Sequence, residues 1–510
     1  MDLLKKIGAL ASLERELRYL LMYSPLRFDR RFGAIKPEGS LGLIYLVGAL
    51  SQNGHHVDLL DCAVGNEKYS LKDTFYRETE LPNGMRRVGM SITEILSEVA
   101  LYDVIGISSI FTAQTSMVSE MVKAISTEYP EKIILLGGVN ARSQKKLFFD
   151  VGADIIATSE AETTIIEIAR QLRTRNINLS LIPGIAFMNQ GSISINHAQV
   201  LQNLDLLPVP RWDMQPYRKY QEIARPHGGG FSKDNPVKYA PIMTSRGCIY
   251  ECDFCHIANE NEKSDSGNLR KLRLKSLDRV MHEMAILKGL GTEHVFIEDD
   301  SLLGYKKRMM DILREIIKLD VKLSGVNGIN ISHLCTTDNK PGVDHALLEL
   351  MAEAGFQKIM LPVESGSRRI IKKYATGKLD LDRHDIIGLI KKVKSLGMHA
   401  GGNYTFGYPD ETIEEVKETF EIAKVHMSAG LDNANFMIIT PFPGTPFYDR
   451  VVRDNLFLPG VKIDELDWTQ VAIKTIVPKE VLEEMITKGW ESVNKPERIR
   501  RIRELSTIPS

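Results

Sequence analysis

Short runs of apolar residues alternate with longer, helix-length segments along most of the chain. In the first 205 residues, the apolar runs that predict strands are 18–25, 56–61, 103–110, 132–138 and 154–158. Helix-length stretches lie between them, such as residues 41–54, where Gly54 provides a stop signal. This alternation predicts an α/β fold with a parallel, doubly wound, Rossmann-like sheet. Such sheets bind ligands at the carboxyl ends of their strands, where the strand order reverses.

The same alternation returns further along the chain with a different set of strands. The apolar runs that predict strands are 240–245, 294–299, 322–328, 358–364, 399–407 and 433–440. Residues 276–291 and 344–356 predict two of the helices between them. Six such units favour a partial (β/α)6 barrel of the TIM type, whose chemistry is expected at the carboxyl ends of the strands.

A linker and a tail account for the rest of the chain. Residues 206–239 are rich in Pro, Gly and polar side chains, which is typical of an interdomain connection, although the HGGG stretch at 227–230 would also suit a mobile loop over a site. Residues 456–510 predict a helical C-terminal region. Its basic run, 495–504, is either a solvated helix face or a docking surface for an acidic electron donor. The predicted domains are 1–205, 206–239, 240–455 and 456–510.

Composition narrows the class of protein. The chain has 510 residues, of which 43% are hydrophobic and 26% charged, as in a globular protein of several domains. A net charge of −1 excludes broad electrostatic attraction to nucleic acid or anionic membranes. No apolar run approaches the roughly 20 residues that a membrane-spanning helix needs. We therefore expect a cytoplasmic protein.

Three of the five cysteines lie within eight residues, in the segment MTSRGCIYECDFCHIA at 243–258. Five cysteines in a chain of this length cannot form a disulfide framework, so the group indicates a metal site in a reducing compartment. Cys248, Cys252 and Cys255 have the spacing Cys-x3-Cys-x2-Cys, just past a predicted strand. Cysteine thiolates suit iron–sulfur clusters, and three ligands for four irons leave one iron open to a substrate.

Structural zinc is the main alternative for this cysteine group. A closed zinc site needs a fourth ligand, and His256 directly follows Cys255, so the chain would have to bend sharply to use it. No second Cys-x2-Cys pair follows. Zinc is therefore the weaker interpretation.

The cysteine segment resembles that of the radical S-adenosylmethionine (SAM) enzymes. The resemblance implies a [4Fe–4S] cluster on the three cysteines, with the amino and carboxylate groups of SAM on the open iron and a 5′-deoxyadenosyl radical as the product of its cleavage. Phe254 matches the aromatic residue that the family places against the adenine. The remaining SAM-binding residues that the resemblance implies follow the later strands: Glu298, Asp299, Asp300, Asn327, Glu364, Ser365 and Tyr408.

The first region resembles the cobalamin-binding domain found ahead of many radical SAM domains. Its matching segments are PEGSLGLIYLVGALSQNGHHVDLLD (37–61), VIGISSIFTAQ (104–114), LLGGVNAR (135–142) and ATSEAE (157–162). Small hydroxyl and amide side chains suit hydrogen bonds to corrin amides, and glycines let the backbone approach a flat macrocycle closely. The implied cobalamin-binding residues are Ser108, Ser109, Thr112, Gln114, Gly137, Gly138, Asn140, Glu160 and Glu162.

Two departures from the cobalamin-binding pattern change what is expected. The segment Asp-x-His-x-x-Gly, which supplies a histidine to cobalt, does not occur. His55 and His56 precede a predicted strand and suit surface or packing positions better. The family's GG-x-H-A reads GGVNA here, with Asn140 in place of the histidine. The resemblance thus implies cobalamin bound without a protein histidine on cobalt.

The motifs are closest to those of the cobalamin-dependent carbon methyltransferases, in particular the phosphonate C-methyltransferase of fosfomycin biosynthesis. That resemblance implies methylation of an unactivated carbon of a small biosynthetic substrate through methylcobalamin, with two SAM molecules and an external one-electron donor such as flavodoxin or ferredoxin. Enzymes with the same domain pair that cyclise or rearrange their substrates are the alternative. Methylthiotransferases acting on RNA need more N-terminal cysteines than Cys62 alone. A non-catalytic cobalamin or iron–sulfur sensor is a further alternative from a different class.

Overall fold

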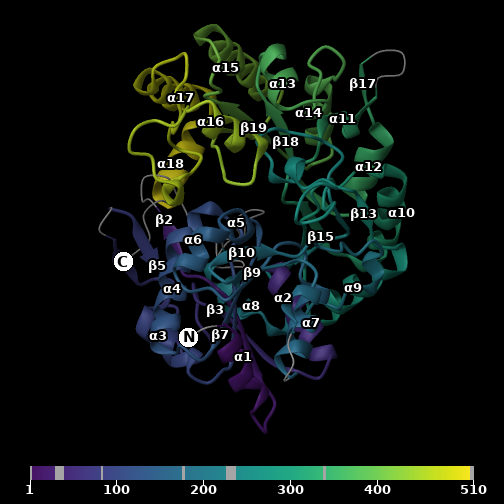
Figure 1. The fold of residues 1–510 in the computed structure, drawn as a ribbon. Coiled ribbons are helices and arrows are strands. Elements are labelled where there is room, and N and C mark those ends of the chain that lie inside the picture. Colours follow the sequence, from purple (N-terminus) through teal and green to yellow (C-terminus); the bar gives the residue numbers. More distant parts are fainter. Residues whose placement is uncertain are drawn as a thin grey trace. The chain divides into compact units, whose positions relative to one another are not determined.

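The structure, a computed structural model, describes residues 3–28, 40–81, 84–174, 178–224, 237–336 and 341–505, with side chains to residue 500. These residues form two compact units (Figure 1). Unit 1 holds the described residues up to 224 together with residues 260–269, and unit 2 holds residues 237–259 and 270–505. The HGGG stretch of the linker lies outside the described residues.

A seven-stranded sheet forms the centre of unit 1, in the order β10-β9-β8-β7-β6-β1-β3. Its strands are β1 (Arg18–Tyr23), β3 (His56–Asp61), β6 (Val104–Ser108), β7 (Ile133–Gly137), β8 (Ile155–Ala157), β9 (Ile185–Asn189) and β10 (Ser192–Ile195). The five strands from β3 to β8 are parallel. Their order reverses between β1 and β6, so the carboxyl ends of these two strands mark the expected ligand site.

Helices cover both faces of this sheet. They are α1 (Leu3–Ala11), α2 (Leu41–Gln52), α3 (Ile92–Val99), α4 (Thr115–Glu128), α5 (Val139–Ser143), α6 (Lys145–Asp150), α7 (Glu162–Leu172) and α8 (Tyr217–Ile223). Alternate residues of β1 belong to two different apolar cores: Leu21 packs with residues of α1, α2 and α7, while Leu20 packs with residues of α3, α4 and α6. Burial on both faces explains why the predicted strands read as continuous apolar runs.

The sheet of unit 1 is mixed rather than wholly parallel. β9 pairs antiparallel with both β8 and β10. Gln190 and Gly191 connect β9 to β10, and both have positive φ, 48° and 82°. Two such residues form the tight hairpin turn that matches the twist of the strands, and this antiparallel edge was absent from the predicted strand list. A small antiparallel sheet, also not predicted, contains β2 (Leu26–Phe28), β5 (Arg86–Val88) and β4 (Glu78–Glu80).

Unit 2 contains a six-stranded parallel sheet in the order β11-β14-β15-β18-β19-β20. The strands are β11 (Tyr239–Ile242), β14 (His294–Ile297), β15 (Lys322–Gly325), β18 (Phe356–Glu364), β19 (His399–Phe406) and β20 (Asn433–Ile438). Each coincides with one of the six predicted strands. Sequential parallel strands joined by helices are the arrangement of a partial TIM-type barrel, with the helices on the outside.

The helices and short strands of unit 2 lie between and after these strands. The helices are α9 (Leu277–Gly289), α10 (Lys306–Ile316), α11 (Ile331–Leu334), α12 (His345–Glu353), α13 (Arg368–Tyr374), α14 (Ile386–Ser395), α15 (Ile413–Ser428), α16 (Pro446–Arg453), α17 (Lys479–Val493) and α18 (Pro496–Leu505). The short strands are β12 (Ser245–Arg246), β13 (Arg273–Leu274), β16 (Cys335–Thr336) and β17 (Gly342–Val343).

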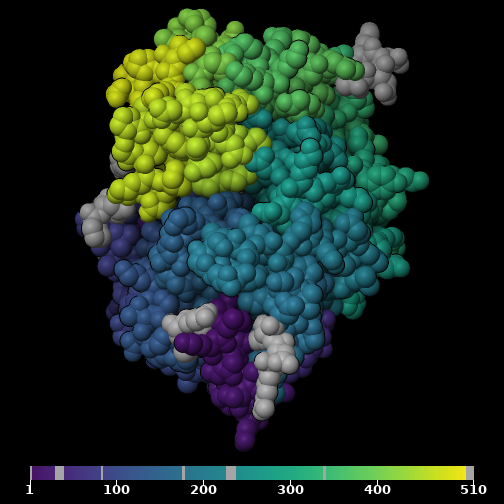
Figure 2. All heavy atoms as spheres, in the orientation of Figure 1, coloured from purple at the N-terminus to yellow at the C-terminus, as the bar shows by residue number. Residues whose placement is uncertain are grey.

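The C-terminal region is helical only in its second half. Residues 456–478 are mostly irregular, and α17 and α18 follow. Figure 2 shows this region in yellow, against the green part of the same unit. Among the helices that the structure describes, none combines the length and apolar character needed to span a bilayer.

Candidate functional site

The cysteine loop of unit 2 follows the first barrel strand and is fixed at several points. At its start, the carboxylate of Asp299 accepts hydrogen bonds from the Thr244 N–H and from the hydroxyls of Thr244 and Ser245, each at 2.6 Å. In its second half, the Asp253 N–H donates to the Tyr374 carbonyl (2.9 Å), and the Asp253 carbonyl accepts from the Phe447 N–H (2.8 Å). A loop held at both ends in this way presents its cysteines from a rigid base.

The three thiols of this loop are free, and burial changes their acidity. Burial raises the pKa of Cys252 to about 11 and that of Cys255 to about 12, and it also raises the pKa of Cys248. A thiol in such surroundings stays protonated at neutral pH unless a cation takes the place of the proton. Iron supplies that cation, so the three side chains fit an iron–sulfur cluster.

The spacing of the thiols bears on the kind of metal centre. The described residues include no group of three His, Cys, Asp or Glu side chains arranged around a single metal ion. The three cysteines of a [4Fe–4S] site each bind a different iron atom. Such a site therefore does not require the sulfur atoms to meet at one point.

Lys378 lies beside these cysteines and was not singled out from the sequence. Its ammonium group is 2.5 Å from Oε1 of Glu364 and 5.7 Å from the centre of the Phe254 ring. Burial alone would lower the pKa of Lys378, but Glu364, Cys252 and Cys255 raise it above the usual lysine value. The lysine thus remains a cation next to the thiols, where it favours their thiolate form.

Tyr250, between the first two cysteines, ties the loop to α11. Its hydroxyl group lies 2.7 Å from Oγ of Ser332 and 3.0 Å from Nε2 of His333. The tyrosine and histidine rings are also in contact, with centroids 5.7 Å apart. Burial lowers the pKa of His333 to about 4, so this contact is made with the neutral imidazole at physiological pH. No sequence signal distinguished these two residues.

The three acidic residues after β14 lie in different environments. Asp299 is 2% exposed, and its oxygens accept the hydrogen bonds from Thr244 and Ser245 described above. Asp300 accepts from the Gly247 N–H at 3.2 Å, and the Asn327 amide donates to the Glu298 carbonyl at 2.9 Å. Asn327 thus lies beside the main chain of Glu298, and Asp300 lies beside Gly247, whereas Asp299 supports the start of the cysteine loop. Their predicted contacts with SAM remain predictions.

Glu364 and Ser365, at the end of β18, point to different partners. Oε2 of Glu364 accepts a hydrogen bond from Thr405 (3.0 Å), while Oε1 contacts Lys378. Glu364 also has a positive φ of 66°, which is unusual for a residue with a side chain. The Ser365 hydroxyl instead contacts Thr419 of α15 at 3.2 Å and is fully buried. The structure therefore brings Glu364, but not Ser365, to the cysteines.

Phe254 and Tyr408, the two aromatic side chains predicted near the adenine, share one apolar cluster. Tyr408 is 1% exposed, with its ring 4.5 Å from that of Tyr374, and Phe254 packs against the same group. The Tyr374 hydroxyl donates to Asp410 at 2.6 Å. Phe447 of α16 belongs to the same cluster, and its N–H donates to the Asp253 carbonyl of the cysteine loop. The cluster therefore supports that loop.

Glu411, just after this aromatic turn, is expected to make stability depend on pH. Burial raises its pKa to about 8, while its carboxylate accepts from the Gly407 N–H at 2.7 Å. The folded protein thus binds this proton more tightly than the unfolded chain does. The free energy of unfolding should therefore fall by on the order of 3 kcal/mol between about pH 5 and pH 8 through this group. Chemical denaturation of Glu411→Gln should lack this loss; an unchanged pH profile would contradict the assignment.

In unit 1, most of the residues predicted to bind cobalamin meet at the ends of β6 and β7. The Asn140 amide donates to the hydroxyls of Ser109 (2.8 Å) and Thr115 (3.0 Å). The side-chain oxygen of Gln114 accepts from the N–H groups of Ile110 (2.7 Å) and Phe111. Ser108 and Thr112 are buried in the same loop. Asn140 therefore stabilises the loop after β6. The residue that replaces the family's histidine thus has a structural role in this chain.

Several buried polar atoms at this end of the sheet have no hydrogen-bond partner within the described chain. They are Oγ of Ser24 after β1, Nε2 of Gln114 after β6 and Oγ1 of Thr158 after β8. Buried polar atoms normally find a partner, so these three indicate a missing polar ligand. Corrin side chains carry amide groups that both donate and accept. The residues present therefore fit cobalamin at the edge where the strand order reverses.

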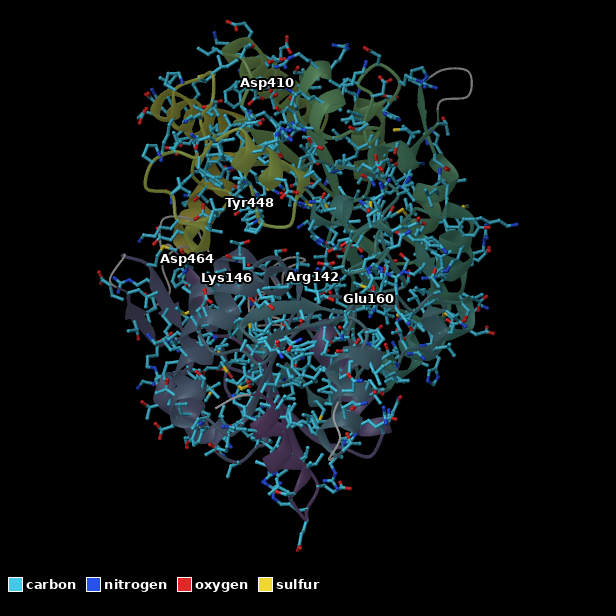
Figure 3. All side chains as sticks on the ribbon, in the orientation of Figure 1. Arg142, Lys146, Glu160, Asp410, Tyr448 and Asp464 are labelled. Atoms are coloured by element: carbon cyan, nitrogen blue, oxygen red, sulfur yellow. The ribbon has the colours of Figure 1, made fainter. Side chains whose placement is uncertain are left out.

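Glu160 and Glu162 lie beyond the end of β8. Glu160 interacts electrostatically with Arg142, whose pKa burial lowers to about 10, and Glu162 begins α7. Arg142, Lys146 and Glu160 lie along the same side of unit 1 (Figure 3). Arg142 also forms an ion pair with Glu260. Residues 260–269, which directly follow the cysteine motif, thus belong to unit 1 through this pair and a hydrogen bond from Ser159 to the Ser266 carbonyl (2.7 Å).

Gly138, between β7 and α5, is a position where the backbone leaves no room for a side chain. Its φ is 102°, and a Cβ atom there would lie 2.4 Å from the Ser109 carbonyl oxygen. Gly138→Ala is therefore expected to lower the free energy of unfolding by at least about 2 kcal/mol and to weaken cobalamin binding. Gly137→Ala is the matched control, because its Cβ would meet only Ala157, at 3.8 Å. Equal thermal unfolding and cobalamin titration of the two variants would contradict this.

Two family models match the chain. The radical SAM superfamily model matches residues 242–423, and the B12 binding domain model matches residues 37–169. The chain therefore contains a radical SAM domain and a B12-binding domain. The radical SAM match covers the cysteine loop and the four barrel strands β14, β15, β18 and β19, and the B12-binding match covers the loops after β6, β7 and β8.

Individual relatives align with large parts of the chain. An uncharacterised methyltransferase of Pyrococcus horikoshii is 29% identical over 60% of this chain and 59% of its own length. The chain thus spans about three fifths of that relative. The cytidylyl-2-hydroxyethylphosphonate methyltransferase of Streptomyces wedmorensis is 25% identical over 84% of this chain and 81% of its own length. The solved structure of the cobalamin-dependent SAM radical enzyme OxsB covers 96% of this chain and 72% of that chain with a TM-score of 0.68, at 17% identity.

These comparisons confirm the predicted family resemblance, the two-part α/β fold and the cofactors, namely a [4Fe–4S] cluster, SAM and cobalamin. The phosphonate methyltransferase that the sequence motifs resemble is one of these relatives. The individual binding residues stay predictions, because no comparison reports contacts of single side chains.

Proposed function

We propose that this protein is a cobalamin-dependent radical SAM methyltransferase that methylates an unactivated carbon of a small biosynthetic molecule. The observation that carries the proposal is a loop of three free cysteines on a partial barrel, Cys252 buried and the other two partly buried, in a chain that also has a B12-binding unit. An sp3 carbon without a lone pair or an acidic proton requires radical activation before it accepts a methyl group. The bound cofactors supply reductive cleavage of SAM and a transferable methyl group.

Residues of unit 2 support the SAM half of this chemistry. Cys248, Cys252 and Cys255 are the proposed cluster ligands, with Lys378 as a cation beside them. Glu298, Asp300 and Asn327 form an acidic and amide group suited to an ammonium ion, which a carboxylate binds through charge-assisted hydrogen bonds. Phe254, which packs against the cluster that contains the buried Tyr408, offers an apolar face for the adenine ring.

Residues of unit 1 support the cobalamin half. Ser24, Gln114 and Thr158 have buried polar atoms that corrin amides would satisfy. Ser108, Ser109 and the backbone at Gly137 and Gly138 line the same sheet edge. No histidine lies in these loops after β6, β7 and β8 as the structure describes them, which agrees with cobalamin bound without a protein ligand on cobalt.

The proposal includes a source of electrons. Cleavage of SAM needs one electron from outside, for which a flavodoxin- or ferredoxin-type donor in the cytoplasm is proposed. Cysteine thiolates that bind iron persist in a reducing compartment.

Anaerobic reconstitution with iron, sulfide and cobalamin, followed by a strong reductant and SAM, tests the proposal by mass spectrometry of the products. Wild-type protein is expected to form both 5′-deoxyadenosine and S-adenosylhomocysteine. Alanine at Cys248, Cys252 or Cys255 should abolish 5′-deoxyadenosine, a loss of more than about 100-fold. Cys335→Ala is the matched control, since Cys335 is a buried cysteine of the same unit outside the loop.

The two products separate the possible failures. Formation of 5′-deoxyadenosine alone, with cobalamin bound and reducible, would overturn methyl transfer in favour of cyclisation or rearrangement. Formation of neither product by protein with an intact cluster would overturn the enzymatic proposal itself.

A further inference from the structure

The interior face of the barrel carries an unusual set of side chains on its last two strands. The register pairs Gly401, Asn403 and Thr405 of β19 with Asn433, Asn435 and Met437 of β20. The opposite face bears Tyr404, Phe406 and Phe436, which pack on Phe420 and His426 of α15. Because α15 lies outside the barrel, the first set of residues faces the interior.

Three asparagines on this face form what we call the amide row: Asn403, Asn433 and Asn435. The Asn433 amide donates to Oδ1 of Asn435 at 3.1 Å, and the Asn435 amide donates to Oδ1 of Asn403 at 2.9 Å. Asn433 is buried, whereas Asn403 and Asn435 are partly exposed, although β19 is an inner strand of the sheet. Partial exposure of a polar side chain in the middle of an inner strand indicates a solvent-accessible interior at that level.

The C-terminal helices bring an arginine to the amide row. β20 is an edge strand, and the Asn494 side chain pairs with its free edge by accepting from the Ala434 N–H (3.0 Å) and donating to the Ala434 carbonyl (2.9 Å). One turn later, Nη2 of Arg498 donates to Oδ1 of Asn435 at 2.9 Å. Arg498 thus reaches around the open edge of the barrel to its interior face.

Hydrogen-bond donors dominate at this point of the interior. In the described structure the Asn403 amide nitrogen has no partner, and its oxygen is already used by Asn435. Arg498 carries only donors, and its partner Asn435 uses its own oxygen to accept from it. Carboxylates at either end of the strands have lysine partners: Glu364 pairs with Lys378, and Asp432 pairs with Lys394. Their charges are therefore balanced and do not oppose an anion between them.

We propose that Asn403, Asn435 and Arg498 bind an oxyanion of the substrate, either a phosphate-type group or a carboxylate. The inference rests on the proposed function, because it assigns the barrel interior to a small-molecule substrate. A guanidinium group with a neighbouring amide donor binds oxyanions through charge-assisted hydrogen bonds. Asn435 and Arg498 lie beyond the radical SAM match, which ends at residue 423, and Asn403 lies within it.

The position of the site relates the anion to the reacting carbon. Thr405, one interior position further along β19, contacts Glu364 beside the cysteines. Successive interior positions of a strand are roughly 7 Å apart. The oxyanion therefore lies about one such step deeper than the Glu364–Lys378 pair. It anchors the substrate at a distance from the carbon that reacts, so that remote binding energy positions that carbon.

Thermal unfolding of the anaerobically reconstituted full chain tests the site, with inorganic phosphate and acetate as probes against chloride of equal ionic strength. Wild-type protein is expected to gain several degrees at saturating probe through the linkage between binding and unfolding. Arg498→Gln should lose at least about nine tenths of that gain. Asn403→Asp, which keeps the side-chain shape but adds a negative charge, should lose it as well. Arg500→Gln, on the same helix, is the matched control and should keep it.

The outcomes are distinct. Protection by phosphate alone assigns a phosphate-type group, and protection by acetate alone assigns a carboxylate. Equal protection of wild type and Arg498→Gln, or no protection of wild type by either probe, overturns the site. Cleavage of SAM by wild-type protein without substrate is measured in parallel. If wild-type protein does not cleave SAM, the proposed function is refuted, independently of the protection data.

Discussion

Replacing Lys378 with methionine is expected to reduce SAM cleavage at least about 100-fold and to lower the free energy of unfolding by about 3–5 kcal/mol. Glu364 is 5% exposed, and its contacts are Lys378 and Thr405. Without the ammonium group, a buried carboxylate loses its counter-charge, and the thiolates of Cys252 and Cys255 lose a nearby cation. Chemical denaturation and quantification of 5′-deoxyadenosine measure the two losses separately.

A second variant separates stability from chemistry at this pair. Combining Lys378→Met with Glu364→Gln removes both charges and should recover most of the lost stability, because no unpaired buried charge remains. Cleavage of SAM should stay low, since the cation beside the thiols is still absent. Lys373→Met is the surface control, because Lys373 pairs with the partly exposed Asp410. Full recovery of cleavage in the double variant would refute a role for Lys378 at the cluster.

The parallel strands were predictable because burial on both faces leaves continuous apolar runs in the sequence. β3 coincides with the predicted run 56–61, and β18 and β19 fall within two residues of theirs. The hairpin of β9 and β10 was missed because β10 has only four residues, SISI, and buries none of them, so it lacks the continuous apolar run that marks the parallel strands. Residues 456–478 contain enough apolar residues to suggest helices, but long-range contacts such as the bridge between Phe457 and Ile473 hold them as irregular chain.

The site was predictable only where residues sit inside a compact motif. The spacing of the three cysteines identifies them without structural information, because neighbouring positions in one loop are close in space. Lys378 lies 123 residues beyond Cys255 in the chain, in the segment ATGKLD, and only the fold brings it to the thiols. Likewise, Arg498 appeared as part of a basic run, and only the pairing of Asn494 with β20 turns it toward the barrel interior.

Asp299→Asn is expected to reduce the iron and sulfide content of reconstituted protein to below about one fifth of wild type, as measured by iron and sulfide assays and by absorbance. The sequence offers three adjacent acidic residues with no means of ranking them, and the structure separates them. The buried Asp299 carboxylate accepts from three donors of Thr244 and Ser245. An asparagine would direct an N–H group at one of these donors, and an uncompensated buried donor costs about 1–3 kcal/mol at the base of the cysteine loop.

Asp300→Asn is the matched control for Asp299→Asn, because it removes a charge from the neighbouring carboxylate. Asp300 accepts from the Gly247 N–H at the longer distance of 3.2 Å, and its side chain is less buried than that of Asp299. The Asp300 variant should therefore keep its cluster but require at least about tenfold more SAM for half-maximal cleavage, as for a residue that contacts the ammonium group. The opposite pattern, with a full cluster and weakened SAM binding in Asp299→Asn, would mean that Asp299 faces SAM and that Thr244 and Ser245 hold the loop without it.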